Sequence, residues 1–367
     1  MNGVHFVLGS PNAYIHEPGI LHQAGEWIGQ YGRSVFIVTG SKSWDSCGNR
    51  LTDSLDKASI LYEVHKFRGE CSYEEVSRLK ELVPTNMEMI CGVGGGKVLD
   101  TAKALANSLN KPFVAIPTLA ATCAAVANLS VMYTEDGVYI DFPVYVRGTL
   151  LCLVDTEIIA SSPVRYLGAG IADTLAKWIE APMAAKGKKQ NLPTIGGLQA
   201  AKLCYDTLIE HSAQAMKDSY HSIPSEALQH VIDANLLFSG MVAGLGEDNC
   251  RSAGAHAIHN GLTVIPETHL ILHGEKVAYG ILVQLALEKR SQSYIDEIIT
   301  FYQEVGLPYR LEQIGIHREL SNAEWNEVAR ISLLPASTMG NMSFAVTSEM
   351  VLDAFRQVEQ WSSPIQS

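Results

Sequence analysis

The chain has 367 residues, of which 47% are hydrophobic and 18% charged, so it is long enough for two domains that each bury a core. A formal net charge of -12 argues against non-specific binding to nucleic acid, and no apolar run reaches the length of a membrane span. Seven scattered cysteines without a C-x-x-C pair, and an N-terminus without a signal-peptide pattern, predict a reduced, cytoplasmic protein.

The first part of the chain alternates short apolar runs with segments of helical periodicity. Strands are expected at 4–8, 34–39, 60–67, 87–91, 113–116 and 150–154, and helices at 20–31, 43–58, 74–82 and 98–109. This alternation predicts a parallel sheet covered by helices. The segments 128–133 and 139–142, split by Asp136-Gly137, are expected to form a hairpin inserted into that sheet.

From Pro163 onward, the pattern becomes helical throughout. Helices are expected at 163–181, 195–217, 225–246, 250–262, 274–288, 293–305, 322–334 and 347–359. Prolines at 163, 182, 193, 224 and 308 are expected at the breaks between them. We therefore predict an α/β domain over 1–160 and an all-α domain over 161–367, with a site in a cleft between the two.

A glycine-rich turn follows the expected strand at 87–91. The segment 91–103 reads C-G-V-G-G-G-K-V-L-D-T-A-K, with a helix beginning near Val98. Glycines let the backbone approach an anion closely, and the free N–H groups and dipole of a helix N-terminus attract it. The G-x-G-x-x-G spacing of the usual dinucleotide fingerprint is absent, so the turn by itself is consistent with phosphate binding or with an ordinary strand–helix connection.

One aspartate and four histidines form a candidate metal site. Asp173 lies in G-I-A-D-T-L-A-K, His256 and His259 lie in A-H-A-I-H-N-G, and His269 and His273 lie in E-T-H-L-I-L-H-G-E-K. An aspartate with two neutral imidazoles is a normal ligand set for a catalytic zinc with one open position. The alternative is that these histidines are satisfied polar groups between two helices.

The glycine segment, the A-H-A-I-H-N-G-L-T block and the H-G-E-K-V-A-Y-G block resemble the iron-containing alcohol dehydrogenase superfamily. The resemblance is to its glycerol dehydrogenase-like branch, close to the hydroxycarboxylate dehydrogenases, and covers nearly the whole chain. It implies a dehydroquinate synthase-like architecture, with a Rossmann-like dinucleotide-binding domain and a helical metal-binding, catalytic domain. It also implies that Asp173, His256 and His273 bind the metal, and that His259 and His269 do not.

The resemblance implies cofactor contacts in the first domain, to NAD or NADP. The implied positions are Ser41, Gly94, Gly95, Gly96, Lys97, Asp100, Thr118, Ala121, Leu129 and Tyr133. Ser41 stands where glycerol dehydrogenases have an aspartate near the adenosine ribose, so the choice between NAD and NADP stays open. By themselves, Leu129 and Tyr133 favour a plain hairpin core, and Asp100 and Lys103 are consistent with a helix surface; Lys103 is left out of the predicted site.

Two departures from the glycerol dehydrogenase pattern bear on the substrate. Cys123 replaces an aspartate that contacts glycerol in the P-T-x-A-S-T-D run, and Ala121 replaces a serine. Lys177 lies one turn after Asp173, where that branch usually has a small residue. Losing a negative group and gaining a positive one both favour an anionic substrate. We therefore predict a 2-hydroxy acid/2-oxo acid pair, with Lys177 pairing only with Asp173 or Glu180 as the alternative.

Other aspects of the function are less specified. His259, acting through water, is the candidate general base. Three ligands without a fourth histidine favour zinc, with iron as the alternative.

Competing functions are a glycerol dehydrogenase, a dehydroquinate synthase-like cyclase and a non-catalytic protein that retained the fold. The expected partners are a small-molecule substrate and, by resemblance, further copies of the chain; neither nucleic acid nor membrane is expected.

Overall fold

A six-stranded sheet carries the first part of the chain. The computed structural model describes residues 7–361, for Glu247 the backbone only. Within them, the strand order is β1-β8-β5-β4-β2-β3 and every pairing is parallel, which confirms the predicted α/β sheet. The strands are β1 (Ala13–Glu17), β2 (Ser34–Thr39), β3 (Leu61–Lys66), β4 (Met89–Gly94), β5 (Phe113–Pro117) and β8 (Leu151–Asp155).

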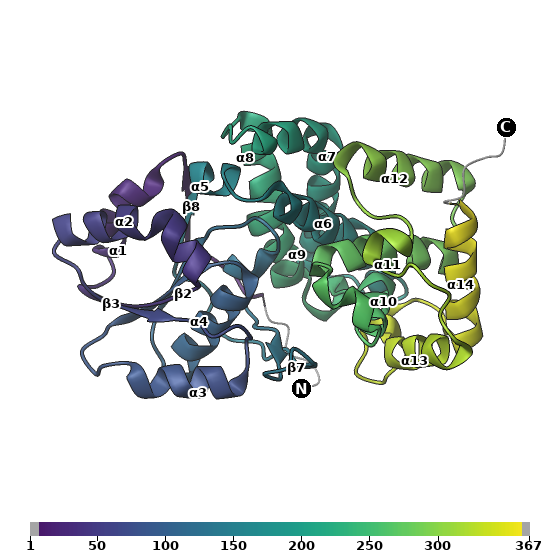
Figure 1. Ribbon diagram of the computed structural model, residues 1–367, viewed down its shortest axis with the longest axis horizontal. Coiled ribbons are helices and arrows are strands. Elements are labelled where there is room, and N and C mark those ends of the chain that lie inside the picture. Colours follow the sequence, from purple (N-terminus) through teal and green to yellow (C-terminus); the bar gives the residue numbers. More distant parts are fainter. Residues whose placement is uncertain (1–6, 362–367) are drawn as a thin grey trace.

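Alternate side chains of the central strands enter two different cores. Along β2, Val35 and Ile37 belong to one hydrophobic cluster, and Phe36 and Val38 belong to the other. This is the period of two that an extended chain imposes. Figure 1 shows α1 and α2 on one side of the sheet and α3 and α4 on the other. These helices are α1 (Ala24–Ile28), α2 (Ser41–Lys57), α3 (Tyr73–Leu82) and α4 (Gly96–Ser108).

Helices make up the rest of the described chain after β8, and they lie beside the α/β part in green to yellow in Figure 1. They are α5 (Thr156–Ala160), α6 (Val164–Ala185), α7 (Leu192–Tyr220), α8 (Glu226–Asp233), α9 (Ser239–Gly246), α10 (Gly254–Leu262), α11 (His273–Leu287), α12 (Gln292–Val305), α13 (Asn322–Ser332) and α14 (Ser348–Trp361). None of the helices within residues 7–361 is both long and apolar enough to cross a bilayer. The exact domain boundary at 160/161 stays a prediction.

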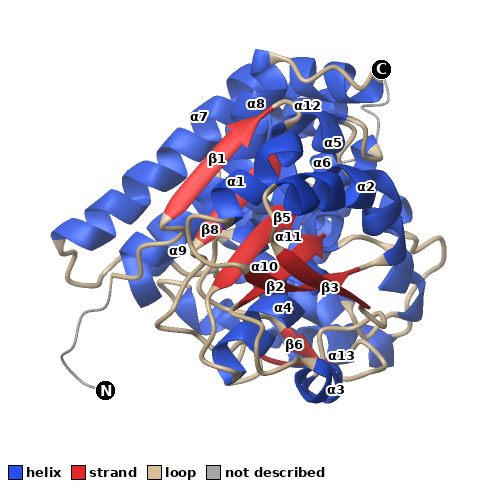
Figure 2. Cartoon of the chain, turned by 90° about the vertical axis from the view of Figure 1, so that its left-hand side faces the viewer, coloured by secondary structure: helices blue, strands red, loops and turns tan. Residues whose placement is uncertain are grey.

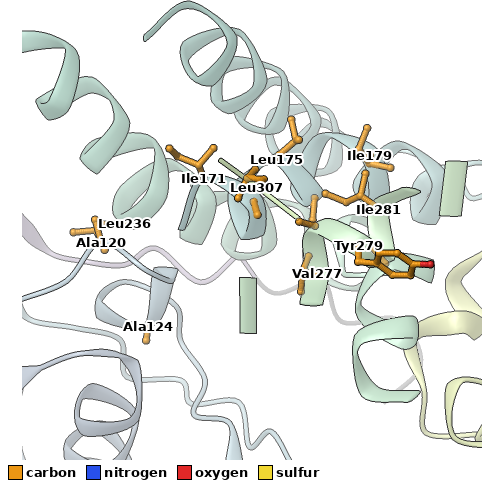
Figure 3. Packing of buried hydrophobic residues seen from close by; sticks show 14 of the residues in the cluster. Ala120, Ala124, Ile171, Leu175, Ile179, Leu236, Val277, Tyr279, Ile281 and Leu307 are labelled. Carbon is orange, nitrogen blue, oxygen red and sulfur yellow. The ribbon is translucent and has the colours of Figure 1, made fainter. Parts of the chain in front are cut away.

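The helices α6, α10 and α11 approach one another closely. Ile171, Leu175 and Ile179 follow α6 at intervals of four and share a core with Ile281 of α11 (Figure 3). Glycine permits the contact, because a Cβ on Gly274 would lie 1.8 Å from the backbone oxygen of Ala169. The first turn of α11 is therefore held directly against α6.

The first predicted strand was placed too early in the chain. Residues 4–6 lie outside the described part, and residues 7 and 8 are not in a strand. The edge strand is β1 instead, whose sequence A-Y-I-H-E has too few apolar residues to stand out from the pattern. It is recognisable only from its pairing with β8. Figure 2 shows β1 at the margin of the sheet.

The predicted insertion of a hairpin into the main sheet is wrong. β6 (Met132–Tyr133) and β7 (Tyr139–Asp141) pair antiparallel, but they form a separate two-stranded sheet. No place is free for them between β5 and β8, because those two strands bond to each other directly. All three residues of β7 are exposed, so this hairpin lies on the surface.

Two predicted helix ends also differ from the structure. Pro182 was expected at a break but lies inside α6. The helix expected over 225–246 is divided into α8 and α9 by a π-helical turn at Ala234–Phe238. Such turns are common at functional sites, and hydrophobic periodicity does not reveal them.

Gly280 tests the close packing of α10 on α11. A Cβ there would lie 2.3 Å from the backbone oxygen of Ala255, which cannot move without displacing α10. We expect Gly280→Ala to lower the free energy of unfolding by about 3 kcal/mol, the upper end of overpacking costs. Thermal and denaturant unfolding would measure it. Gly340→Ala is the control, because nothing lies within 4 Å of its added Cβ; equal stability of both variants would contradict the packing described here.

Candidate active site

One carboxylate and two imidazoles from three helices meet beside the α/β part. Asp173 of α6 has an oxygen 3.2 Å from Nε2 of His256 on α10 and 3.6 Å from Nε2 of His273 at the start of α11. One ligand atom from each residue lies within 4.8 Å of the others, and Asp173 is buried. Among the described residues, this is the one group of at least three such side chains that is close enough to hold a metal ion.

Further side chains fix both histidine rings. Glu180 accepts from Nδ1 of His256 at 2.6 Å and from its backbone N–H at 3.0 Å. Nδ1 of His273 lies 3.0 Å from Nε2 of His259, whose own Nδ1 lies 2.9 Å from the Asn260 side-chain oxygen. In both His256 and His273, Nδ1 is engaged and Nε2 is directed toward Asp173. Such contacts orient metal-binding histidines and select their tautomer.

The charges of this cluster depend on one another. Burial alone would raise the pKa of Asp173, but Lys177 and the two histidines outweigh it and hold that pKa well below its usual range. Burial alone would lower the pKa of His256, but Glu180 and Asp173 raise it to about 9. Lys177, 3.5 Å from the Asp173 carboxylate, likewise has its pKa raised despite burial. Asp173, Glu180 and Lys177 are therefore all charged at neutral pH.

Cys123 faces the same cluster from the α/β part. Burial raises the pKa of its thiol, and this shift is opposed by Lys177 and reinforced by Asp173. The thiol is therefore neutral at physiological pH, so the side chain at position 123 carries no charge. Ser239, at the start of α9 directly after the π-helical turn, is the hydroxyl beside it.

The glycine turn lies where an open α/β sheet usually binds its ligand. The strand order reverses between β2 and β4, and the turn follows the carboxyl end of β4 at that point. A Cβ on Gly94 would lie 2.9 Å from Cβ of Val98, and one on Gly95 would lie 2.9 Å from Leu119. The N-terminus of α4 has no side-chain cap, so its N–H groups face outward for a ligand.

The structure brings most of the predicted cofactor residues to this edge. Ser41 is exposed in the first turn of α2, after β2, and Thr118 follows β5, with its hydroxyl 3.4 Å from that of Ser43. Lys97 lies over the Tyr133 ring, with 5.9 Å from its Nζ to the ring centroid. Of the other predicted positions, Gly96 begins α4, Ala121 lies just before the short turn at Cys123–Ala125, and Leu129 forms an isolated bridge with Val144.

Asp100 is engaged within the protein instead. It is buried; one carboxylate oxygen accepts from Lys103 at 3.1 Å and the other from the backbone N–H of Val131. Lys103 is fully buried and also donates to the backbone oxygens of Ala124 and Leu129. The alternative that these two residues lie on a helix surface is therefore wrong. They connect α4 to the segments at 124 and 129–131.

The match to known proteins extends over the whole chain. A family model described as "Iron-containing alcohol dehydrogenase" matches residues 11–156. The chain is 36% identical to glycerol dehydrogenase of Pseudomonas putida over 356 residues, 96% of each chain. It is also 36% identical to hydroxycarboxylate dehydrogenase A of Escherichia coli over 367 residues, 99% of each. The crystal structure of Schizosaccharomyces pombe glycerol dehydrogenase superposes with a TM-score of 0.90 at 32% identity, covering 98% of this chain and 92% of that one.

The chain belongs to the iron-containing alcohol dehydrogenase family. It is therefore an oxidoreductase that acts on CH–OH groups. This family works with a nicotinamide cofactor and a divalent metal ion. The residues present fit both groups: the Asp173 cluster supplies one carboxylate and two oriented imidazoles, and the glycine turn offers an uncapped helix N-terminus that side chains would obstruct.

Several features of the alcohol dehydrogenase site were not evident in the sequence. Glu180 was considered only as a partner of Lys177, but its shortest contact is with His256. Glu70, which pairs with Lys97, lies in a loop without a recognisable motif. His269 is exposed and directed at the backbone oxygen of Thr263, away from the cluster. A glutamate seven residues after Asp173, on the same helix face, was the available signal for Glu180.

Glu180 provides a test of the metal site that leaves its three expected ligands intact. We expect Glu180→Gln to weaken metal affinity by about 10- to 100-fold, because the substitution removes the negative charge that orients His256 through its Nδ1. Competition with a chromophoric chelator would measure the affinity. Glu304→Gln, an exposed substitution on α12, is the control. Unchanged affinity in Glu180→Gln would mean that His256 does not need this support, or that the metal binds elsewhere.

Proposed function

We propose that this alcohol dehydrogenase interconverts a small 2-hydroxy acid and the corresponding 2-oxo acid with NAD or NADP. The observation that carries the proposal is the pairing of Lys177 with Asp173 beside a neutral Cys123. A partly buried ammonium next to the expected metal site is suited to a substrate carboxylate. The similarity to hydroxycarboxylate dehydrogenase A supports this reading. The runner-up, glycerol and dihydroxyacetone, is supported by the similarity to glycerol dehydrogenases.

Asp173, His256 and His273 would hold the metal ion, for which this ligand set favours zinc, and the turn at Gly94, Gly95 and Gly96 would hold the cofactor phosphates. When bound, the metal polarises the substrate oxygen and the nicotinamide exchanges a hydride with the substrate carbon. The side chains of the chain bind and orient. Lys177 fixes the substrate carboxylate, and the uncharged Cys123 leaves room for it without repulsion.

The contacts of His259 support a positioning role rather than the role of a general base. Its Nε2 lies within hydrogen-bond distance of Nδ1 of His273, at 3.0 Å, and its Nδ1 lies 2.9 Å from the Asn260 side-chain oxygen. Burial lowers the pKa of His259 well below its usual range, and His273 and Lys276 lower it further, so the ring is neutral. A neutral ring in this geometry accepts a hydrogen bond from Nδ1–H of His273 at its Nε2 and donates one from its Nδ1–H to the Asn260 side-chain oxygen. It thereby keeps His273 Nε2 unprotonated.

A substrate screen tests the proposed function. We expect the metal-loaded protein to oxidise NADH or NADPH with 2-oxobutyrate or 2-oxoglutarate much faster than with dihydroxyacetone. Near-ultraviolet absorbance of the reduced cofactor follows the reaction, and removing the metal with a chelator should abolish it. Faster turnover of glycerol and dihydroxyacetone would establish the runner-up. Conversion of substrate without net consumption of cofactor would indicate a cyclase.

Lys177 separates the two candidate substrate classes. We expect Lys177→Met to raise KM for the 2-oxo acid by about tenfold or more, the value of a charge-assisted hydrogen bond, and to change KM for dihydroxyacetone little. Steady-state kinetics with both compounds would show the difference. Lys186→Met, exposed just after α6, is the control, and metal content verifies that the site is intact. Equal effects on both substrates would contradict an anion-binding role.

A further inference from the structure

Lys276 is a nearly buried ammonium in the first turn of α11. It lies three residues after His273, so the two side chains share one face of the helix. Only 7% of the residue is exposed. Within the described part of the chain, the one hydrogen-bond acceptor of Nζ is the backbone oxygen of Thr268, at 3.5 Å.

This lysine has no counter-ion. Among residues 7–361, no carboxylate oxygen lies within ion-pair distance of its Nζ, although Glu275 is next to it in sequence. Glu275 is bound by Arg165 through two contacts of 2.6 Å and by the backbone N–H of Leu272. An ammonium removed from water normally finds several acceptors, because leaving its donors unmatched costs free energy.

Lys103, which is buried, and Lys177, which is partly buried, both have an acidic partner within the protein. Lys103 donates to Asp100 at 3.1 Å and to two backbone oxygens at 2.6 and 2.7 Å. Lys177 has the carboxylate of Asp173. Lys276 has one long contact to a neutral oxygen instead. Lys103 and Lys177 therefore have a carboxylate partner within the protein, whereas the ammonium of Lys276 remains available for a ligand.

The surroundings of Lys276 connect the two halves of the site. Burial lowers its pKa to about 8, and repulsion from Lys97, at the N-terminus of α4, lowers it further. Lys276 in turn lowers the pKa of His259, the neighbour of His273. Its ammonium is therefore close enough to interact electrostatically both with Lys97, at the glycine turn, and with His259, beside His273. Lys97 there pairs with Glu70, whereas Lys276 and the uncapped N-terminus of α4 have no carboxylate partner among residues 7–361.

We propose that Lys276 binds the diphosphate of the nicotinamide cofactor from the helical side, opposite the glycine turn and Lys97. The inference rests on the proposed function, because that function places a nicotinamide cofactor on the turn and its reacting end near the metal. A diphosphate lies between the adenosine and the nicotinamide riboside and carries two negative charges, so it matches the unpaired ammonium of Lys276 together with the uncapped N-terminus of α4. Cofactor binding then connects both parts of the chain.

Binding of cofactor fragments tests this without turnover. Isothermal titration calorimetry of the metal-loaded protein would compare NADH, NADPH, ADP-ribose, which retains the diphosphate, and AMP, which lacks it. We expect Lys276→Met to raise Kd for the dinucleotides and for ADP-ribose by about tenfold or more, and to leave AMP within about threefold. Lys276→Arg should retain most of the affinity, because it preserves the charge.

The control variant is Lys111→Met, a partly buried lysine that also donates to a backbone oxygen but lies at the far end of α4. Lost charge should also make the ADP-ribose affinity of Lys276→Met less sensitive to salt, which a merely structural lysine would not do. Unchanged ADP-ribose binding in Lys276→Met, or an effect confined to KM of the 2-oxo acid, would overturn the inference alone. If the unmodified protein binds neither dinucleotide, the proposed function itself is wrong.

Discussion

The site depends on the interactions that stabilise the buried carboxylate of Asp173. An ionised carboxylate removed from water is stable only when opposite charge and hydrogen bonds surround it. Lys177 comes from its own helix, whereas His256 and His273 come from two others. The fold must therefore bring α10 and α11 against α6 with little tolerance. Glycines at the contacts make this possible: Gly274 against Ala169, and Gly280 against Ala255.

The side chains that orient the two histidines come from the same closely packed helices. Glu180 lies two turns after Asp173 on α6, so one helix supplies both the shared carboxylate and the group that orients His256. On the other side, His259 lies one turn after His256 on α10 and orients His273 of α11. Each histidine is thus held by a residue of the neighbouring helix. Rigid helices with connected side chains maintain ligand geometry better than loops do.

The sequence predicted those features that depend on local spacing. Parallel strands β2 to β5 and the glycine turn follow from apolar runs and from glycine, and Asp173, His256 and His273 follow from a motif resemblance. It did not reveal β1, because an edge strand needs few apolar residues, nor the π-helical turn at Ala234–Phe238, because a one-residue insertion leaves hydrophobic spacing nearly unchanged. The burial of Lys103 was also not predicted, since the two backbone oxygens that it contacts, those of Ala124 and Leu129, lie more than twenty residues away.

Charge relates the site to its proposed substrate. Without metal, the positive Lys177 and protonated His256 balance the carboxylates of Asp173 and Glu180. A divalent ion at the proposed metal site would displace the His256 proton and add two charges, which would leave the cluster with one net positive charge. An aspartate at position 123, as in the glycerol dehydrogenase pattern, would cancel that charge and suit a neutral polyol. The neutral thiol of Cys123 leaves it in place, so a monoanionic substrate completes the balance.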